Sequence, residues 1–144
     1  MTKIIIIGAG AMGSAFSVPC IENKNDVTLV GTHLEDDLIE KIKFNKNFHP
    51  VLDVALPKDL KIEKYEKLNS VLNNKPDIIV AAISSVGIEW FVEKFSNYYL
   101  KNLPIVLLTK GLAIIDNELS TLSDKIKKLL IKQGHKEINI SAIK

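Results

Sequence analysis

Arginine is absent from this 144-residue sequence, and all 19 of its basic residues are lysines. Arginine is the side chain that grips phosphate with two parallel hydrogen bonds, so phosphate recognition here has to use lysine, hydroxyl or backbone N–H groups. The 17 acidic residues leave a net charge of only +2. Such a balance lacks the basic surface of a nucleic-acid-binding protein, and we expect no nucleic-acid partner.

Cysteine is nearly absent too, because Cys20 is the only one. No intrachain disulfide can form, which favours a cytoplasmic location, and we expect Cys20 to pack in the core rather than act as a catalyst. Long apolar runs are missing as well, since the run at residues 4–7 ends at Gly8. That run is too short for a signal peptide or a membrane span. A chain of this length forms one domain and buries about 70% of its unfolded surface, so it needs no metal ion.

Hydrophobic patterning predicts an alternation of strands and helices along the whole chain. Predicted strands cover residues 3–7, 26–30, 77–82, 104–108 and 137–143, and predicted helices cover residues 11–22, 35–43, 65–72, 86–95 and 117–132. We expect Pro19 to kink or shorten the first helix and Gly134 to stop the last. Residues 44–60 form a long connection, with at most a short strand near residues 60–63. The pattern predicts a Rossmann-type, doubly wound, mainly parallel sheet with helices on both faces, forming one domain over residues 1–144.

A glycine-rich turn follows the first strand, with the sequence G-A-G-A-M-G at residues 8–13. Its context is the one a dinucleotide-binding turn requires, with a strand directly before it and a helix directly after. Gly8 permits the tight turn, Gly10 lets the backbone approach a pyrophosphate, and Gly13 lets the helix pack against the sheet. The N-terminus of the helix offers unpaired N–H groups to the phosphates. The turn therefore predicts a dinucleotide cofactor.

The end of the second strand indicates which dinucleotide is bound. An acid at that place accepts a hydrogen bond from the ribose 2′-hydroxyl and favours NAD. This chain has Gly31, Thr32 and His33 there, and its first acids, Glu35 and Asp36, come later. Thr32 and His33 can donate hydrogen bonds to a 2′-phosphate, although His33 is equally compatible with a solvated loop. We expect binding of NAD or NADP with a mild preference for NADP.

Two other strand ends carry polar residues that can face a ligand, because ligands bind beyond the carboxyl ends of parallel strands. Ser84 and Ser85 follow the strand at residues 77–82, and Lys110 follows the strand at residues 104–108, directly before a glycine. A lysine there can reach a phosphate or a substrate oxygen as a point charge. The pattern alone favours simpler interpretations, in which the serines cap a helix and Lys110 is solvated.

Together these segments resemble the NAD(P)-dependent glycerol-3-phosphate dehydrogenases. The similar segments are G-A-G-A-M-G-S-A at residues 8–15, L-V-G-T-H-L-E-D-D at 29–37, A-A-I-S-S at 81–85 and I-V-L-L-T-K-G-L-A at 105–113. The T-K-G-L part is the most specific of them. The resemblance implies that Ala11 and Met12 lie against the dinucleotide, although the family often has an aromatic residue in place of Met12. It also implies that Thr32 or His33 lies at the adenosine ribose, and that Lys110 reaches both the nicotinamide side and the substrate as a catalytic residue.

The resemblance implies hydride transfer between NAD(P)H and dihydroxyacetone phosphate, a small phosphorylated triose, which gives glycerol 3-phosphate for glycerophospholipid metabolism. In the family the last strand leads into a helical domain that holds a second lysine and grips the substrate phosphate. This sequence ends at Lys144, to which we do not assign the second lysine's role. We therefore expect the chain alone to bind cofactor without catalysing the reaction.

Two alternative functions stay open at this stage. A ketopantoate reductase can share the glycine turn, although the T-K-G-L segment argues against it. A stand-alone dinucleotide-binding or regulatory module without catalysis also fits a sequence that ends at Lys144. The oligomeric state is likewise open, and a homodimer is among the arrangements that the sequence allows.

Overall fold

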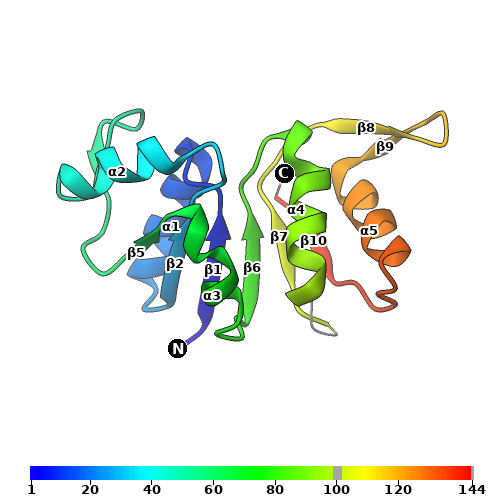
Figure 1. Ribbon diagram of the computed structural model, residues 1–144, viewed down its shortest axis with the longest axis horizontal. Coiled ribbons are helices and arrows are strands. Elements are labelled where there is room, and N and C mark those ends of the chain that lie inside the picture. The colour runs from blue at the N-terminus through cyan, green and yellow to red at the C-terminus, as the bar shows by residue number, and fades with distance from the viewer. Residues whose placement is uncertain (99–101, 144) are drawn as a thin grey trace.

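The computed structural model describes residues 1–98 and 102–143, and its centre is a six-stranded parallel sheet (Figure 1). Its strands lie in the order β10-β7-β6-β1-β2-β5. They are β1 (Lys3–Ile7), β2 (Asp26–Val30), β5 (Lys61–Glu63), β6 (Ile78–Ala81), β7 (Ile105–Leu107) and β10 (Ile140–Ala142). Chain order reverses direction between β1 and β6, which is the arrangement of the doubly wound dinucleotide-binding fold. The predicted fold class is confirmed.

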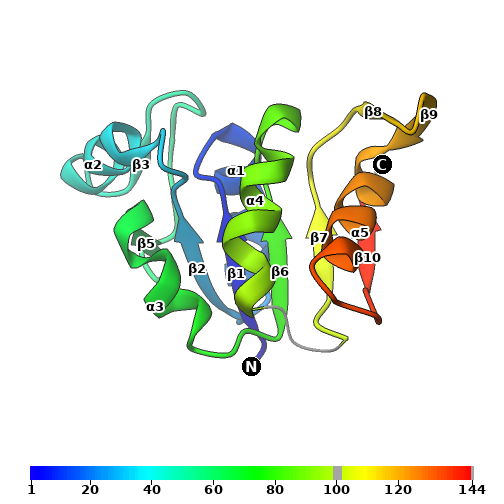
Figure 2. The ribbon, with the colours of Figure 1, turned by 45° about the vertical axis from the view of Figure 1, so that its right-hand side comes forward.

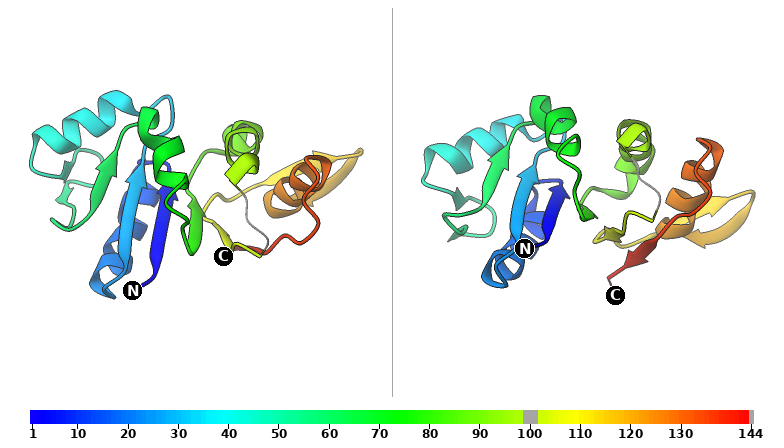
Figure 3. Two further views of the ribbon diagram at one scale, coloured as in Figure 1. Left: turned by 60° about the horizontal axis from the view of Figure 1, so that its bottom comes forward. Right: turned by 90° about the horizontal axis from the view of Figure 1, so that it is seen from below.

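Helices cover both faces of this sheet. They are α1 (Ala11–Glu22), α2 (Asp36–Phe44), α3 (Leu68–Leu72), α4 (Ile88–Phe95) and α5 (Leu122–Lys132), with short 3₁₀ turns at Tyr65–Lys67, Ser85–Gly87 and Ser96–Tyr98. Successive side chains of a strand point to opposite faces. In β1, Ile5 and Ile7 therefore join the core under α3, α4 and α5, while Ile4 and Ile6 join the core under α1 and α2. Figure 3 shows α4 and α5 on one side of the sheet and α1 on the other.

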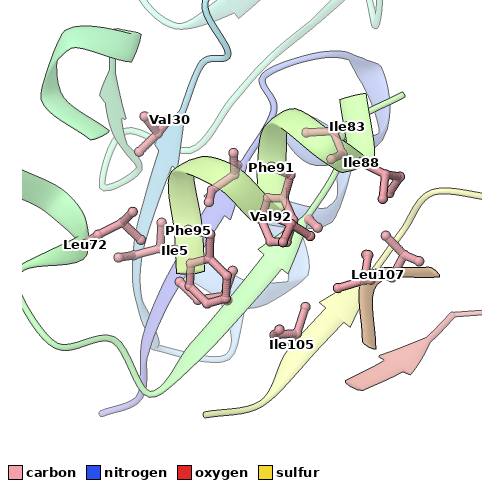
Figure 4. Close-up of a cluster of buried hydrophobic side chains, with 14 of the residues drawn as sticks. Ile5, Val30, Leu72, Ile83, Ile88, Phe91, Val92, Phe95, Ile105 and Leu107 are labelled. Carbon is pink, nitrogen blue, oxygen red and sulfur yellow. The ribbon is translucent and has the colours of Figure 1, made fainter. Parts of the chain in front are cut away.

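The core beneath α4 holds the strands in place (Figure 4). Phe91 and Phe95 are stacked with ring centroids 5.2 Å apart. They belong to the same buried cluster as Ile105 and Leu107 of β7 and Ile5 of β1. Buried aromatic and branched side chains pack densely and leave little freedom of movement. The carboxyl ends of β1, β6 and β7 therefore have fixed relative positions, which a site built on them requires.

Helix α1 is fully buried against the sheet only at small residues, while its apolar side chains Phe16, Val18, Cys20 and Ile21 pack against the core partly buried. Gly13, Ser14 and Ser17 are its buried residues, and the Ser14 hydroxyl donates to the Ala9 carbonyl at 2.9 Å. Small side chains let the helix axis come close to the strands. The helix continues past Pro19 to Glu22, so the expected shortening is wrong.

The predicted helix at residues 117–132 is wrong in its first turn. Leu112–Ile115 and Glu118–Thr121 instead form a hairpin, β8 and β9, which projects away from the main sheet (Figures 1 and 2). Asp116 and Asn117 connect its strands with φ of 52° and 65°, as a two-residue hairpin turn requires. A capping box between Thr121 and Asp124 then starts α5. The Lys128 ammonium group hydrogen-bonds the Asp116 carboxylate and lowers its pKa, which ties the hairpin to α5.

Smaller departures concern the irregular segments. The predicted connection at residues 44–60 contains a short hairpin of β3 (Phe48–His49) and β4 (Val54–Ala55) before the expected strand β5. The last strand is shorter than predicted, because β10 covers only Ile140–Ala142. Lys144 lies outside the described residues.

Candidate functional site

Two glycines of the turn between β1 and α1 are required by the fold itself. Gly8 has φ +110°, and a Cβ built on it would lie 2.2 Å from the Ala82 carbonyl oxygen. A Cβ on Gly13 would lie 2.0 Å from the Gly8 carbonyl oxygen and 2.9 Å from the Ala82 Cβ. The roles predicted for Gly8 in the tight turn and for Gly13 in helix packing agree with this geometry. A side chain at either position would force α1 away from the sheet.

Gly10 differs from both, because a Cβ there would have only the Glu35 Oε1 atom nearby, at 3.5 Å. Gly10 is also the N-cap of α1, and no side chain caps this helix. The first N–H groups of a helix lack partners within the helix and carry partial positive charge. The start of α1, at Ala11 and Met12, is therefore open to an anion from the side on which Gly10 has no side chain.

A cleft of about 560 Å³ runs from this turn along the carboxyl ends of the strands. Its lining consists of Gly10, Ala11, Met12, Glu35, Ala82, Ile83, Ser84, Ser85, Leu108, Thr109 and Lys110. The cleft brings together six of the residues predicted to bind cofactor, which come from the loops after β1, β6 and β7. Met12 lines the cleft and is 58% exposed. The Ser84 side chain makes no hydrogen bond as a helix cap, so its expected capping role is absent.

Lys110 is presented at the rim of the cleft by its two neighbours. The Thr109 hydroxyl donates a hydrogen bond to the Ile83 carbonyl, which joins the loop after β7 to the loop after β6. Gly111 has φ +143°, a conformation that favours glycine, and turns the chain toward β8. Lys110 itself is exposed between these two anchors. A fixed backbone with a free side chain suits a lysine that has to reach a ligand.

Thr32 and His33 do not line the cleft. The Thr32 N–H group donates to the Glu35 Oε2 atom at 2.7 Å. The His33 ring packs beside Trp90 and Tyr65, with centroid distances of 5.1 Å and 6.0 Å. His33 thus lies at the end of β2 against α4, and Trp90 next to it is the only tryptophan of the chain.

Glu35 and His49 contact the glycine turn, and the sequence interpretation assigned neither of them to the site. The Glu35 Oε2 atom accepts from the Ala9 N–H group at 3.0 Å. Buried His49 accepts at Nδ1 from the Val51 and Leu52 N–H groups at 3.3 and 3.2 Å, so its other nitrogen, Nε2, carries the proton and donates to the Ala9 carbonyl at 3.1 Å. Both backbone groups of Ala9 are therefore held, its N–H by Glu35 and its carbonyl by His49. His49 came from a connection with no periodic pattern, so no signal in the sequence indicated it.

Truncating His49 is expected to loosen the turn. In His49→Ala the Val51 and Leu52 N–H groups lose their acceptor and the Ala9 carbonyl keeps only its bond from Ser14, so unfolding should become easier by about 1–3 kcal/mol. In His49→Asn the amide oxygen can replace Nδ1 as acceptor, so about half of that loss is expected. Chemical denaturation of the two variants measures the difference. Equal stability of His49→Ala and the wild type would contradict this role.

Other chemistries find little support among the residues that the structure describes. No group of three or more His, Cys, Asp or Glu side chains in residues 1–98 and 102–143 could hold a metal ion. Cys20 packs half-buried against the core, and burial raises the pKa of its thiol, as expected for a structural cysteine. Within the same ranges, no helix has the length and apolar character needed to cross a membrane.

Residues 3–141 match the family model described as NAD-dependent glycerol-3-phosphate dehydrogenase N-terminus. The chain belongs to this family. It is 34% identical over 126 residues to the NADP(+)-dependent glycerol-3-phosphate dehydrogenase of Archaeoglobus fulgidus, covering 88% of this chain and 36% of that protein. It is also 34% identical over 113 residues to a glycerol-3-phosphate dehydrogenase [NAD(P)+] of Wigglesworthia glossinidia brevipalpis, covering 76% of this chain and 32% of that protein. This chain thus spans about a third of the length of these glycerol-3-phosphate dehydrogenases.

Solved structures agree on the fold. A glycerol-3-phosphate dehydrogenase from Saccharomyces cerevisiae superposes with a TM-score of 0.74 at 21% identity, covering 98% of this chain and 41% of that one. A protein named as a 2-dehydropantoate 2-reductase from Enterococcus faecalis superposes with a TM-score of 0.63 at 23% identity, covering 97% of this chain and 40% of that one. The fold is therefore shared with other reductases, and the family model is what separates the glycerol-3-phosphate dehydrogenases from them. Residues 3–141 correspond to the NAD-binding N-terminal domain of this family.

Proposed function

We propose that this domain binds NAD(H) or NADP(H) along the carboxyl edge of its sheet and supplies the cofactor half of an enzyme that interconverts dihydroxyacetone phosphate and glycerol 3-phosphate. The observation that carries the proposal is the cleft that joins the start of α1 to Lys110. It crosses the point where chain order reverses between β1 and β6, which is where ligands bind in open α/β sheets. The residues of the cleft fit a dinucleotide, because Gly10 leaves room for a pyrophosphate against uncapped N–H groups.

The chain's own residues would divide the work along this cleft. The N–H groups at the start of α1 would hold the pyrophosphate, and the loops after β6 and β7 would lie beside the nicotinamide half. The bound nicotinamide would supply the hydride chemistry. Lys110, at the rim, would place a positive charge near the substrate carbonyl oxygen and stabilise the negative charge that develops there.

The substrate side of the site would require residues beyond this domain. β10 runs parallel to β7, so its carboxyl end at Ala142 lies at the same edge of the sheet as the cleft. In the longer relatives, additional residues leaving this edge would stand close to Lys110. We expect them to form a helical domain that grips the substrate phosphate and supplies a second lysine for proton transfer.

We expect a mild preference for NADPH over NADH. Thr32 and exposed His33 can donate hydrogen bonds near a 2′-phosphate, and the A. fulgidus relative is named as NADP(+)-dependent. Because the chain has no arginine to bind the 2′-phosphate, we expect the affinity for NADPH to exceed that for NADH by less than about tenfold, or about 1.4 kcal/mol. Competition titration at fixed salt, followed by the fluorescence of Trp90, measures the ratio. Equal affinities or tighter binding of NADH would refute the preference.

A stand-alone regulatory module and a ketopantoate-type reductase are the alternatives to this proposal. An assay of NADPH oxidation by a chain extended through the proposed helical domain separates them. Turnover with dihydroxyacetone phosphate supports the proposal, turnover with ketopantoate supports the reductase, and binding without turnover supports the module. A cytoplasmic location and a homodimer stay predictions, which fractionation and light scattering of the natural protein can test.

A further inference from the structure

Glu35 is placed to contact a bound dinucleotide, although it follows β2 by five residues. It occupies the N-cap position of α2, yet its side chain does not cap that helix. The carboxylate instead lies between the ends of β1 and β2, where Oε2 accepts the N–H groups of Ala9 and Thr32 at 3.0 and 2.7 Å. Two backbone hydrogen bonds fix this carboxylate over the glycine turn.

The two carboxylate oxygens have different surroundings. Oε2 makes both backbone hydrogen bonds, whereas Oε1 accepts none from residues 1–98 and 102–143. Oε1 lies 3.5 Å from the position that a Cβ on Gly10 would take, and Glu35 lines the cleft. An anchored carboxylate with one unused oxygen is a preformed acceptor for a hydroxyl group.

Glu35 lies on the β2 side of the cleft, where the adenosine half would bind. Gly8 donates its N–H group to the Val30 carbonyl at 2.8 Å, so the glycine turn and the end of β2 are neighbours. A dinucleotide held at the start of α1 places its adenosine ribose on this side and its nicotinamide toward β6 and β7. Lys110 and the serines of the loop after β6 line the other part of the cleft.

We propose that Glu35 sets the cofactor selectivity of this domain. Its carboxylate accepts hydrogen bonds from the ribose hydroxyls of the adenosine half, and it repels a 2′-phosphate, whose charge is about −1.5 to −2 at neutral pH. Glu35 thereby opposes the donors Thr32 and His33 and keeps the preference for NADPH small. This inference rests on the proposed function, because it requires the cofactor to bind in the cleft.

The substitution Glu35→Gln tests the inference. Glutamine keeps an oxygen that can accept the Ala9 and Thr32 N–H groups, but it removes the charge. We expect the ratio of the NADH to the NADPH dissociation constant to rise about tenfold, mainly because NADPH binds more tightly. Displacement of NADPH by ADP and by 2′-phospho-ADP isolates the adenosine end, and the same shift in favour of the 2′-phosphorylated nucleotide is expected.

Asp37→Asn is the matched control, because it removes an exposed negative charge from the first turn of the same helix without touching the cleft. The ratio of the NADH to the NADPH dissociation constant in Asp37→Asn should match that of the wild type. A Glu35→Gln ratio within twofold of the wild type, or an equal shift in Asp37→Asn, overturns the inference while the proposed function stands. Failure of the wild type to bind either cofactor overturns both. Circular dichroism confirms that each variant is folded.

Discussion

Replacing Gly10 with valine is expected to abolish the binding of NADH and NADPH to this domain while leaving its fold intact. Gly10 has φ −62° and ψ −179°, a conformation that valine adopts without strain. The only atom close to a new Cβ is Oε1 of the Glu35 side chain, at 3.5 Å, which is an ordinary contact distance. The fold can therefore accommodate the valine side chain, but the pyrophosphate can no longer bind beside it.

The expected loss of affinity is at least 100-fold, or about 2.8 kcal/mol. The valine methyl groups would keep the phosphates away from the N–H groups at the start of α1. Losing two charge-assisted hydrogen bonds is enough for an effect of this size, since each contributes about 1.5–3 kcal/mol. Titration followed by Trp90 fluorescence measures binding, and thermal unfolding by circular dichroism shows whether the variant is folded.

Gly87→Ala is the matched control for this substitution. Gly87 lies outside the cleft lining with φ −84°, and a Cβ there would make only ordinary contacts, the nearest at 3.6 Å. Its cofactor affinity should equal that of the wild type. A folded Gly10→Val variant that binds both cofactors normally would rule out the glycine turn as the phosphate site.

The glycine turn and the order of elements could be predicted from the sequence because their signals are local. The glycines recur at a fixed spacing between a strand and a helix, and the strands around them are continuous apolar runs. Only the approach of Ala82, which helps to exclude a side chain at Gly8 and Gly13, comes from a distant part of the chain. The hairpin β8–β9 also had local signals, which were missed. Asp116 and Asn117 are common at left-handed hairpin positions, and Thr121 with Asp124 matches a capping box. The apolar residues around them fall at helical spacing, which favoured a helix over the turn.

Glu35 and His49 could not be placed from the sequence, because their roles depend on how loops fold back. In dinucleotide-binding folds, an acid at the end of the second strand favours NAD over NADP. At that position this chain has Gly31 and Thr32. Glu35 reaches the same place only because the following loop returns its carboxylate to the Ala9 N–H group. His49 reaches the Ala9 carbonyl from 40 residues away in sequence. Neither contact leaves a periodic trace in the chain.

The 144-residue chain alone is expected to show no measurable glycerol-3-phosphate dehydrogenase activity, although it binds cofactor. Hydride transfer to a carbonyl requires a proton for the same oxygen, and a positioned proton donor contributes about 10²–10⁴-fold. Holding the substrate at reacting distance contributes up to about 7–11 kcal/mol. Lys110, the only lysine that lines the cleft among the described residues, cannot supply both of these effects.

An assay of NADH or NADPH oxidation with dihydroxyacetone phosphate compares this chain with a chain extended through the proposed helical domain. We expect turnover in the extended chain only. Within it, Lys110→Ala should lower kcat/KM at least about 100-fold, as expected when a charge that stabilises the transition state is lost. Lys58→Ala removes an exposed lysine outside the cleft and should leave kcat/KM unchanged.

The two parts of this prediction depend on different residues and can fail separately. Substantial turnover by the 144-residue chain would mean that residues at the carboxyl edge of its sheet position both the substrate and a proton donor. That result would contradict the proposed division, in which cofactor and substrate are bound by two different domains. Full activity of Lys110→Ala in the extended chain would remove Lys110 from the catalytic site and leave the division standing. Cofactor titration of Lys110→Ala distinguishes a lost contact to the dinucleotide from a lost contact to the substrate. Lys110 follows β7 and Glu35 follows β2, and β6 and β1 lie between these two strands in the sheet. We therefore expect the removal of Lys110 to lower kcat far more than cofactor affinity.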